Sequence, residues 1–287
     1  MKASLVVAVI CFLFSLFNTA KAALFIAAHP DDIQLLMNRN AQIDVKSNYP
    51  TQIVLLTAGD ASHGTSLGSN TMGIPYYRAR LRAHEMSVRF WQGLNPNMPP
   101  PRPVYSVQTI WGKQIETVHM GNVVLYNLNL PDDGTLIRLA TDRLAAVRSI
   151  SPVNTYTLTH VKSVIREIIR INNPATPILN LNTHDPEPFW NPGDHDDHIA
   201  TGAIVSAAVT ELAAWQCINR FFYKGYSLLH KPAVYNEEEL HIHLATIGAL
   251  NAGLLNNGNK STWDSFHNGF AGRMELRGIL GRGYCNF

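Results

Sequence analysis

The stretch "LFIAAHPDDIQLLM", Leu24 to Met37, places five apolar residues directly before a histidine, a proline and two adjacent aspartates. A continuous apolar run is typical of a strand that is buried on both faces of a sheet. In open α/β sheets, ligands bind outside the carboxyl ends of the strands. The stretch therefore predicts a central strand and, just past its end, a functional site.

Similar apolar runs recur along the chain and alternate with helical patterns. The predicted strands are Ala23 to Ala28, Gln52 to Thr57, Val123 to Leu128, Ile178 to Asn182 and Arg220 to Tyr226. The predicted helices are Tyr76 to Gly93, His160 to Asn172, Asp197 to Cys217 and one that starts at Asn236, where Glu239 completes a capping box. This alternation predicts an α/β fold with a largely parallel sheet and flanking helices. The segment around Trp111-Gly112 predicts an added β-hairpin.

The N-terminus reads as a secretory signal peptide. Lys2 precedes the apolar run Ala3 to Phe17, and the small-x-small pattern Ala20-Lys21-Ala22 indicates cleavage after residue 22. The run is shorter than the roughly twenty residues of a membrane span, so an uncleaved anchor is the less favoured alternative. We expect a signal peptide at 1–22, one domain at 23–287, no integral membrane span after cleavage, and a secreted or periplasmic protein.

Charge and cysteine content bear on the partners and on the cellular compartment of the protein. Loss of Lys2 and Lys21 lowers the 23 basic residues to 21, equal to the 21 acidic ones. Such a balance gives no indication of a nucleic-acid partner. Cys217 and Cys285 remain after cleavage, and export to an oxidising compartment favours a disulfide between them over two unrelated thiols.

Polar clusters follow three of the predicted strands: "HPDD" after the first, "TAGD" (57–60) after the second, and the segment 182–198 after the fourth. The last contains His195 and His198, which three residues of spacing place on one face of a helix start. Imidazole and carboxylate are ligands of catalytic zinc, which takes three protein ligands. His29, Asp32 and His198 would form such a set. Each cluster alone could be a solvated turn, but the sheet would bring the clusters together.

These motifs resemble the PIG-L/LmbE-like family of zinc-dependent N-deacetylases, which includes the deacetylases of GlcNAc-phosphatidylinositol and of the mycothiol pathway. The matching segments are "AHPDD" (28–32), "LPDDG" (130–134) and "HDDH" (195–198). The resemblance covers nearly the whole mature chain and implies a Rossmann-like fold. The first and last motifs are the specific ones.

The resemblance implies a role for each motif residue. His29, Asp32 and His198 would bind one zinc ion per chain, and Asp31 would be the general base. His195 would protonate or hydrogen-bond the developing tetrahedral intermediate, with Asp197 setting its charge and orientation. Adjacent residues at a strand end point apart, so one aspartate can bind metal while its neighbour faces water.

The chain also departs from the family. Ile33 and Gln34 stand where many members carry a glutamate, and Met37 to Asn40 replace a glycine-rich continuation. "TAGDA" (57–61) resembles the secreted branch, which includes deacetylases of acylated glucosamine on glycopeptides. Further candidates for binding substrate are Arg80, Asp60, His184 and Trp190, the last as a stacking platform for a sugar ring.

The sequence thus predicts a secreted zinc hydrolase that removes an N-acetyl or other N-acyl group from an amino sugar or glycoconjugate. One alternative is a metal-dependent esterase or amidase that acts on a non-sugar substrate. Another is a carbohydrate-binding module that keeps the metal site without turnover, although binding alone has no need of Asp31, His195 and Asp197 together.

Overall fold

A mixed sheet of eight strands forms the centre of the molecule in the computed structural model, which describes residues 22–68, 70–97, 99–172, 175–176, 179–213, 215–282 and 285–286. The strand order is β11-β10-β9-β1-β2-β5-β4-β3, in which β10, β9, β1, β2 and β5 are parallel. The strand bounds are β1 (Ala22–Ala27), β2 (Thr51–Thr57), β3 (Val104–Ile110), β4 (Lys113–Met120), β5 (Val123–Leu130), β9 (Leu179–His184), β10 (Ile218–Tyr223) and β11 (Leu276–Ile279). Two short pairs lie apart from this sheet: β6 (Val147–Arg148) with β7 (Thr155–Tyr156), and β8 (Ala175–Thr176) with β12 (Cys285–Asn286).

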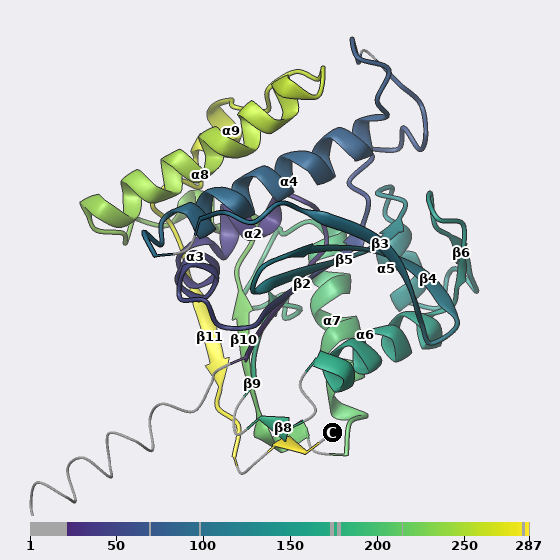
Figure 1. Cartoon of the computed structure of the whole chain (residues 1–287). Coiled ribbons are helices and arrows are strands. Elements are labelled where there is room, and N and C mark those ends of the chain that lie inside the picture. Colours follow the sequence, from purple (N-terminus) through teal and green to yellow (C-terminus); the bar gives the residue numbers. More distant parts are fainter. Residues whose placement is uncertain are drawn as a thin grey trace, which may run out of the picture.

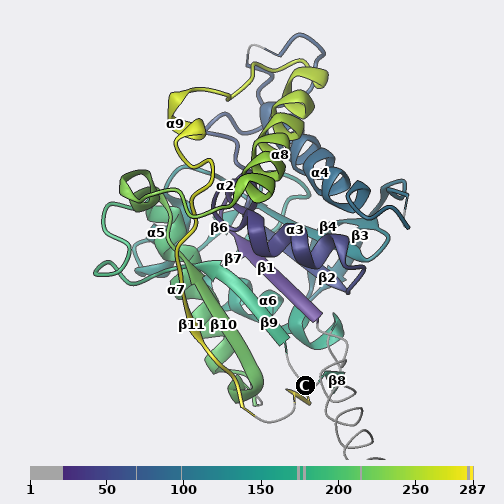
Figure 2. The same ribbon diagram turned by 90° about the vertical axis from the view of Figure 1, so that its left-hand side faces the viewer.

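Helices cover both faces of the sheet (Figures 1 and 2). One face carries α2 (Asp32–Leu36), α3 (Asn38–Lys46), α4 (Tyr76–Gly93) and α8 (Glu237–Asn256). The other carries α5 (Thr135–Ala140), α6 (Leu158–Asn172) and α7 (Asp196–Thr210). The remaining elements are the 3-10 turns Trp215–Cys217 and Tyr226–His230 and the short helix α9 (Ser265–Asn268). The predicted α/β class and the largely parallel sheet are confirmed.

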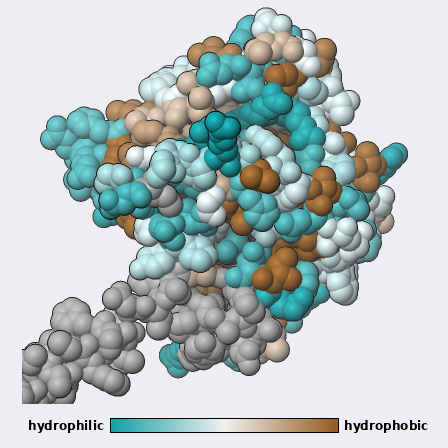
Figure 3. All heavy atoms as spheres, in the orientation of Figure 1, coloured by the Kyte–Doolittle hydropathy of each residue, from teal (hydrophilic) through white to brown (hydrophobic). Residues whose placement is uncertain are grey.

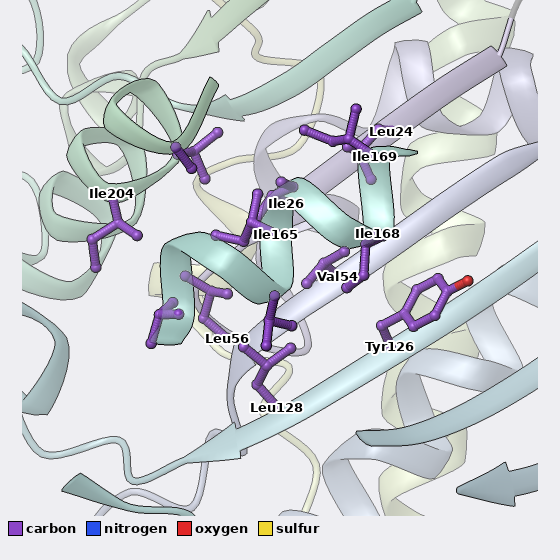
Figure 4. Close-up of a cluster of buried hydrophobic side chains, with 14 of the residues drawn as sticks. Leu24, Ile26, Val54, Leu56, Tyr126, Leu128, Ile165, Ile168, Ile169 and Ile204 are labelled. Carbon is purple, nitrogen blue, oxygen red and sulfur yellow. The ribbon is translucent and has the colours of Figure 1, made fainter. Parts of the chain in front are cut away.

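The central strands are apolar throughout because both of their faces are buried. On β1, Leu24 and Ile26 pack into the cluster that includes Ile165 and Ile168 of α6 (Figure 4), whereas Phe25 packs into the cluster on the opposite face. All six residues of β1 are buried. Successive side chains of a strand point to opposite faces, so an unbroken apolar run fits a strand between two helical layers.

The main helices follow the predicted pattern, with differences at their ends. Residues 76–93 form α4 as predicted, and Asn236 and Glu239 form a capping box at the start of α8. The helix predicted over Asp197 to Cys217 ends at Thr210 instead. The next residue, Glu211, binds Lys162 of α6 at 2.5 Å, and the chain turns there to reach β10.

Two helices that the sequence does not indicate follow directly on the first strand. Asp32 begins α2, and α3 continues from Asn38. Asn38, Asn40 and Asp44 have low helix propensity, so tertiary packing decides the structure here. Ala41 and Val45 are fully buried in the helical layer.

The predicted hairpin is present and extends the sheet through β4, which pairs antiparallel with β5. Trp111 and Gly112 at its turn have φ angles of 49° and 69°. A two-residue hairpin turn of type I′ needs positive φ at both positions, which explains the glycine.

Some predictions concern segments outside the described residues. The predicted signal peptide, 1–22, lies there up to residue 21, and it stays a prediction; Ala22 is the first residue of β1. Ile178 of the fourth predicted strand also lies outside the described residues. Cys217 is disulfide-bonded, but the side chain of Cys285 is not described, so their pairing stays a prediction. Within the described residues, no helix has the length and apolar character needed to span a membrane. Hydrophilic and hydrophobic residues are intermixed on the face shown in Figure 3.

Candidate active site

The polar segments that follow the parallel strands meet at one edge of the sheet. They surround a cavity of about 280 Å³. It is lined by His29, Asp31, Asp32, Leu35, Leu36, Tyr76, Arg80, Asp132, His195, His198, Tyr226, Thr262, Phe266, His267 and Phe270. A larger cavity of about 490 Å³ between α4 and the hairpin shares no lining residue with it. The smaller cavity is the candidate active site because it holds the clustered imidazoles and carboxylates.

Asp32 lies at the centre of three imidazole rings. Its Oδ1 is 3.0 Å from Nε2 of His198, and its Oδ2 is 3.2 Å from Nδ1 of His29 and 3.1 Å from Nε2 of His184. Asp32 is 4% exposed and His184 is fully buried. The structure therefore brings the predicted ligands His29, Asp32 and His198 together and adds His184 to the cluster.

The cluster shifts the proton affinity of its members strongly. Burial alone would raise the pKa of Asp32, but His198, His29 and His184 hold it well below its usual value. Burial alone would lower the pKa of His198, but Asp32 and Asp194 raise it to about 9. The pKa of His29 is likewise raised, against the effect of burial, by Asp32 together with Asp132 and Asp197. The carboxylates therefore concentrate negative charge around these imidazoles.

The environment of the Asp197 carboxylate indicates that the cluster suits a cation. Its side chain is fully buried, and neither carboxylate oxygen has a hydrogen-bond partner among the described residues. Its Oδ2 lies 3.8 Å from Nε2 of His29, and Oδ1 of Asp132 lies 3.2 Å from the same nitrogen. A buried carboxylate without a partner is costly, and a bound cation would offset that cost. The nitrogen and oxygen donors fit a divalent metal ion.

His198 is oriented by a second carboxylate. Its Nδ1 lies 2.8 Å from Oδ1 of Asp194, which also accepts the backbone N–H of Tyr226 at 2.9 Å. Metal-binding histidines are commonly fixed in this way through the ring nitrogen that does not bind the ion. Asp194 thus leaves Nε2 of His198 facing Asp32.

Asp31 lies outside the imidazole cluster although it is the neighbour of Asp32. It lines the cavity, and its Oδ1 accepts a hydrogen bond from Nη2 of Arg80 at 2.5 Å. Arg80 is also bound to the carbonyl of Gly59 at 2.8 Å and lies 3.7 Å from Asp132. Arg80, predicted to bind substrate, therefore lines the cavity while it positions Asp31.

Gly59 allows this arrangement. It has φ of +60°, and a Cβ there would lie 2.5 Å from Cδ of Pro30 and 2.7 Å from Nη1 of Arg80. We expect Gly59→Ala to lower kcat by about 10-fold or more, because displacement of Arg80 misplaces Asp31. Gly64→Ala is the matched control, since Gly64 has φ of +57° and nothing within 4 Å of an added Cβ.

Both variants carry the same backbone strain, of about 1–2 kcal/mol. Steady-state kinetics and denaturant unfolding of the two proteins separate the effect of this strain from the effect of the steric clash of the added Cβ with Pro30 and Arg80. Equal kcat values for Gly59→Ala and Gly64→Ala would show that the contact with Arg80 has no role.

His195 caps the N-terminus of α7. Its Nδ1 accepts the backbone N–H of Asp197 at 3.2 Å, so in the neutral ring the proton sits on Nε2. Burial, together with His29 and His198, lowers the pKa of His195. His195 is thus held as a neutral hydrogen-bond donor at the cavity. Asp197 orients it through its backbone, while the Asp197 carboxylate lies beside His29.

Three predicted substrate-binding residues lie outside the lining of this cavity. Asp60 is 1% exposed, and its carboxylate accepts the backbone N–H groups of Asp132 and Gly64, both at 2.7 Å. His184 belongs to the imidazole cluster around Asp32, and its ring stacks on that of His198 with the centroids 4.2 Å apart. Trp190 is 50% exposed and contacts Phe189.

Four candidate functional residues that line the cavity were not predicted as site residues from the sequence: Asp132, Tyr226, Phe266 and Phe270. Asp132 belongs to the "LPDDG" motif, but the motif does not indicate its contact with His29. Burial alone would raise the pKa of Asp132, but His29 and Arg80 lower it to about 2. Tyr226, Phe266 and Phe270 form one side of the cavity. Their rings contact one another, with centroids 5.2 Å apart for Tyr226 and Phe266. No motif marks these aromatic residues.

A buried histidine supports the turn that carries Asp31. The Nδ1 of His84 donates to the carbonyl of Pro30 at 2.7 Å, and its Nε2 has no partner among the described residues. Burial lowers the pKa of His84 from 6.5 to about 4. The unfolded chain therefore takes up a proton at His84 below about pH 6.5, whereas the folded protein takes it up only near pH 4. Because of this difference, the folded protein loses stability as the pH falls from 6.5 towards 4.

We expect His84→Gln to lose less stability on acidification than the unmodified protein. Between pH 7 and pH 5 the difference should be about 2 kcal/mol in the free energy of unfolding. Urea denaturation of both proteins at the two pH values measures it. An equal loss in both would mean that His84 is protonated in the folded state.

Similarity of this chain to known proteins is found in the fold and not in the sequence. A scan against protein-family models finds no match, and neither does a search of curated proteins. Among solved structures, the N,N′-diacetylchitobiose deacetylase from Pyrococcus horikoshii, complexed with its inhibitor MPG, has a TM-score of 0.51 and 16% sequence identity, with coverage of 92% of this chain and 85% of that chain.

Two further structures have TM-scores of 0.47. The 4-carboxy-2-hydroxymuconate hydratase from Pseudomonas putida KT2440 is 12% identical, and the match covers 93% of this chain and 99% of that one. A triple mutant of the deacetylase of teicoplanin biosynthesis is 14% identical, with 87% of each chain covered. The similarity to the chitobiose deacetylase confirms for this chain the Rossmann-like fold that the motif resemblance implies.

Proposed function

We propose that the protein is a zinc-dependent N-deacetylase of the PIG-L/LmbE-like family that removes an acetyl or other acyl group from an amino sugar or glycoconjugate. The observation that carries the proposal is that two neighbouring aspartates lie in different environments. Asp32 lies within the imidazole cluster, whereas Asp31 faces the cavity and is held by Arg80. A carboxylate beside a metal cluster but outside it is suited to accept a proton from water.

The donor set named above, His29, Asp32 and His198, would hold the ion. A bound zinc ion supplies Lewis acidity toward the amide carbonyl and lowers the pKa of water. Asp31 takes the proton of the attacking water and delivers it to the departing amine. Arg80 holds the Oδ1 of Asp31 in place. The Oδ2 has no hydrogen-bond partner among the described residues and is left for this transfer.

His195 stabilises the negative charge that develops on the carbonyl oxygen. Its Nδ1 is occupied by the N-cap hydrogen bond, so the group available to substrate is Nε2–H. A donor fixed before the reaction needs no reorganisation when the charge appears. The lowered pKa of His195 favours hydrogen bonding by a neutral ring over proton donation by an imidazolium.

The walls of the cavity differ in character in a way that suits an acyl amide of a sugar. Leu35, Leu36, Phe266 and Phe270 offer apolar surface for the acyl group. Arg80 and Asp132 offer hydrogen-bonding groups to hydroxyls on the other part of the substrate. We further propose that the mature chain acts outside the cytoplasm, which rests on the N-terminal sequence alone.

The test is an assay of free amine release by the zinc-loaded protein. Substrates are N-acetylglucosamine oligomers, acyl-glucosamine glycopeptides and simple aryl esters. We expect amine release from one of the first two classes and its loss after chelation. Hydrolysis of aryl esters alone would favour the esterase alternative, and saccharide binding without turnover would favour a binding module.

A further inference from the structure

The cavity of about 490 Å³ between α4 and the hairpin of β3 and β4 is separate from the candidate active site. The helix α4 contributes one face to it, at the spacing i, i+3, i+4, i+7, through Arg78, Leu81, Arg82 and Glu85. Arg80, which lines the candidate active site, lies on another face of the same helix. The volume is within the range of about 300–1,000 Å³ that is common for small-molecule sites.

Two side-chain contacts join α4 to the sheet around this cavity. Arg78 binds both carboxylate oxygens of Glu116 on β4, with Nη1 2.6 Å from Oε2. The hydroxyl of Tyr105 on β3 donates to Oε2 of Glu85 at 2.7 Å. The views in Figures 1 and 2 agree that α4 and β3 lie side by side. The cavity is therefore formed before a ligand arrives, which lowers the entropic cost of binding.

Two charged groups of the cavity have no ionic partner among the described residues. Glu85 is 7% exposed, and its only hydrogen bond there is the one from Tyr105, so Oε1 is left over. Burial raises the pKa of the Glu85 carboxyl, an effect that Tyr105 and Arg82 only partly offset. Arg82 is exposed at the same cavity and donates only to the neutral Oδ1 of Asn257, at 3.1 Å. A buried carboxylate without a cation beside it is costly.

The cavity also offers an unused hydrogen-bonding group and an apolar surface. Asn127 on β5 is 3% exposed, and its Oδ1 is buried without a hydrogen-bond partner among the described residues. Leu81 and Val118, both buried, add apolar surface to the lining. The cavity thus combines two acceptors, one cation and an apolar wall.

We propose that this cavity binds a free amino acid with an apolar side chain. Glu85 and the Oδ1 of Asn127 accept hydrogen bonds from the α-ammonium group, and Arg82 binds the α-carboxylate. Leu81 and Val118 contact the side chain of the ligand. Charge-assisted hydrogen bonds of this kind are the strong ones. The cavity shares no lining residue with the candidate active site, so the inference is independent of the proposed deacetylase function.

The experiment is calorimetric titration of the protein with L-phenylalanine and two analogues. The analogue 3-phenylpropanoate lacks the ammonium group, and 2-phenylethylamine lacks the carboxylate. We expect L-phenylalanine to bind with a dissociation constant of about 1 mM or lower, and each analogue to bind about 10-fold or more weakly, because each loses hydrogen bonds to a charged group. An analogue that binds as tightly as L-phenylalanine would overturn the inference, and so would no binding of L-phenylalanine.

A pair of variants on β3 shows whether the ligand occupies this cavity. Val107→Trp fills the cavity, whereas Val104→Trp is the matched control, because both valines are more than half exposed and only Val107 lines the cavity. Only binding that Val107→Trp abolishes is counted, which excludes a carboxylate held by a metal in the active site. Equal effects of the two variants would overturn the inference. A dimer in solution that Val107→Trp disrupts and Val104→Trp does not would also overturn it, because a second copy would then cover the cavity.

Charge variants on α4 test the assigned contacts. Arg82→Gln and Glu85→Gln should each weaken the binding of L-phenylalanine by about 10-fold or more. Glutamine at 85 keeps the size of the side chain and an acceptor for the hydroxyl of Tyr105. Arg89→Gln is the matched control, since Arg89 is an exposed arginine of α4 outside the lining, and it should leave the affinity unchanged. Equal affinities of Arg82→Gln and Arg89→Gln would show that Arg82 does not bind the carboxylate and would overturn the inference.

Discussion

Asp31→Asn is expected to lower kcat by about 100- to 10,000-fold, or roughly 3 to 5 kcal/mol of barrier, with little change in KM. Asparagine keeps the size of the side chain and an oxygen that can accept from Nη2 of Arg80, the bond that measures 2.5 Å in the structure. It removes the basic oxygen that would take the proton of water. The loss should therefore fall on the chemical step while the fold and the metal stay in place.

The measurement is steady-state kinetics together with metal analysis of the same preparation. Asp133→Asn is the matched control, since Asp133 is the second aspartate of the "LPDDG" motif and binds Thr135 and Arg138 outside the cavity. It should have near-normal kcat. The assignment of Asp31 as the base fails if Asp31→Asn turns over normally, or if its activity falls only in proportion to lost metal.

The central part of the fold and of the imidazole and carboxylate cluster could be predicted from the sequence, because apolar runs mark the strands and parallel strands end at one edge of a sheet. Leu24 to Ala28 are apolar in succession because β1 is covered on both faces. His29, Asp32 and His198 meet because the parallel strands β1 and β9 end at the same edge of the sheet.

Predictions of individual side-chain roles were less informative because burial depends on packing across elements. His184 ends β9 and Asp60 follows β2, which made both candidates for the cleft, yet both are buried beneath it. Conversely, Tyr226 and Phe266 reach the cavity from the last third of the chain. Tyr226 lies in the 3-10 turn after β10 and Phe266 in α9, and the two rings meet through contacts between segments that are distant in the sequence, which no local pattern encodes.

His195 illustrates how structure refines a role without changing the residue. The motif marks it as a group that protonates or hydrogen-bonds the intermediate, and the sequence leaves both open. The N-cap hydrogen bond to Nδ1 and the lowered pKa favour the second role. The backbone geometry at the start of α7 thus determines which ring nitrogen is left without a partner in the helix cap.

The other large effect is expected for Asp32→Asn, which should weaken metal affinity by roughly 100-fold or more. Among the described residues, Asp32 is the one carboxylate within 3.2 Å of His29, His184 and His198 together. Its loss would remove both a proposed ligand and the negative charge at the centre of the cluster. Asp194→Asn gives a graded comparison. Asp194 touches only the outer nitrogen of His198 in this cluster, and outer partners typically contribute 10- to 100-fold to affinity.

Metal affinity is measured by competition with a chelator, and activity is followed as zinc is added back. Activity of Asp32→Asn and Asp194→Asn should rise with added zinc, at a higher concentration for Asp32→Asn, whereas that of Asp31→Asn should stay low at any concentration. If Asp32→Asn binds zinc as tightly as the unmodified protein, the metal is held elsewhere. If Asp31→Asn and Asp32→Asn respond alike to zinc, the two neighbouring aspartates do not have separate roles. A proton acceptor must then be sought among the other cavity residues, such as Asp132, which lies 3.7 Å from Arg80.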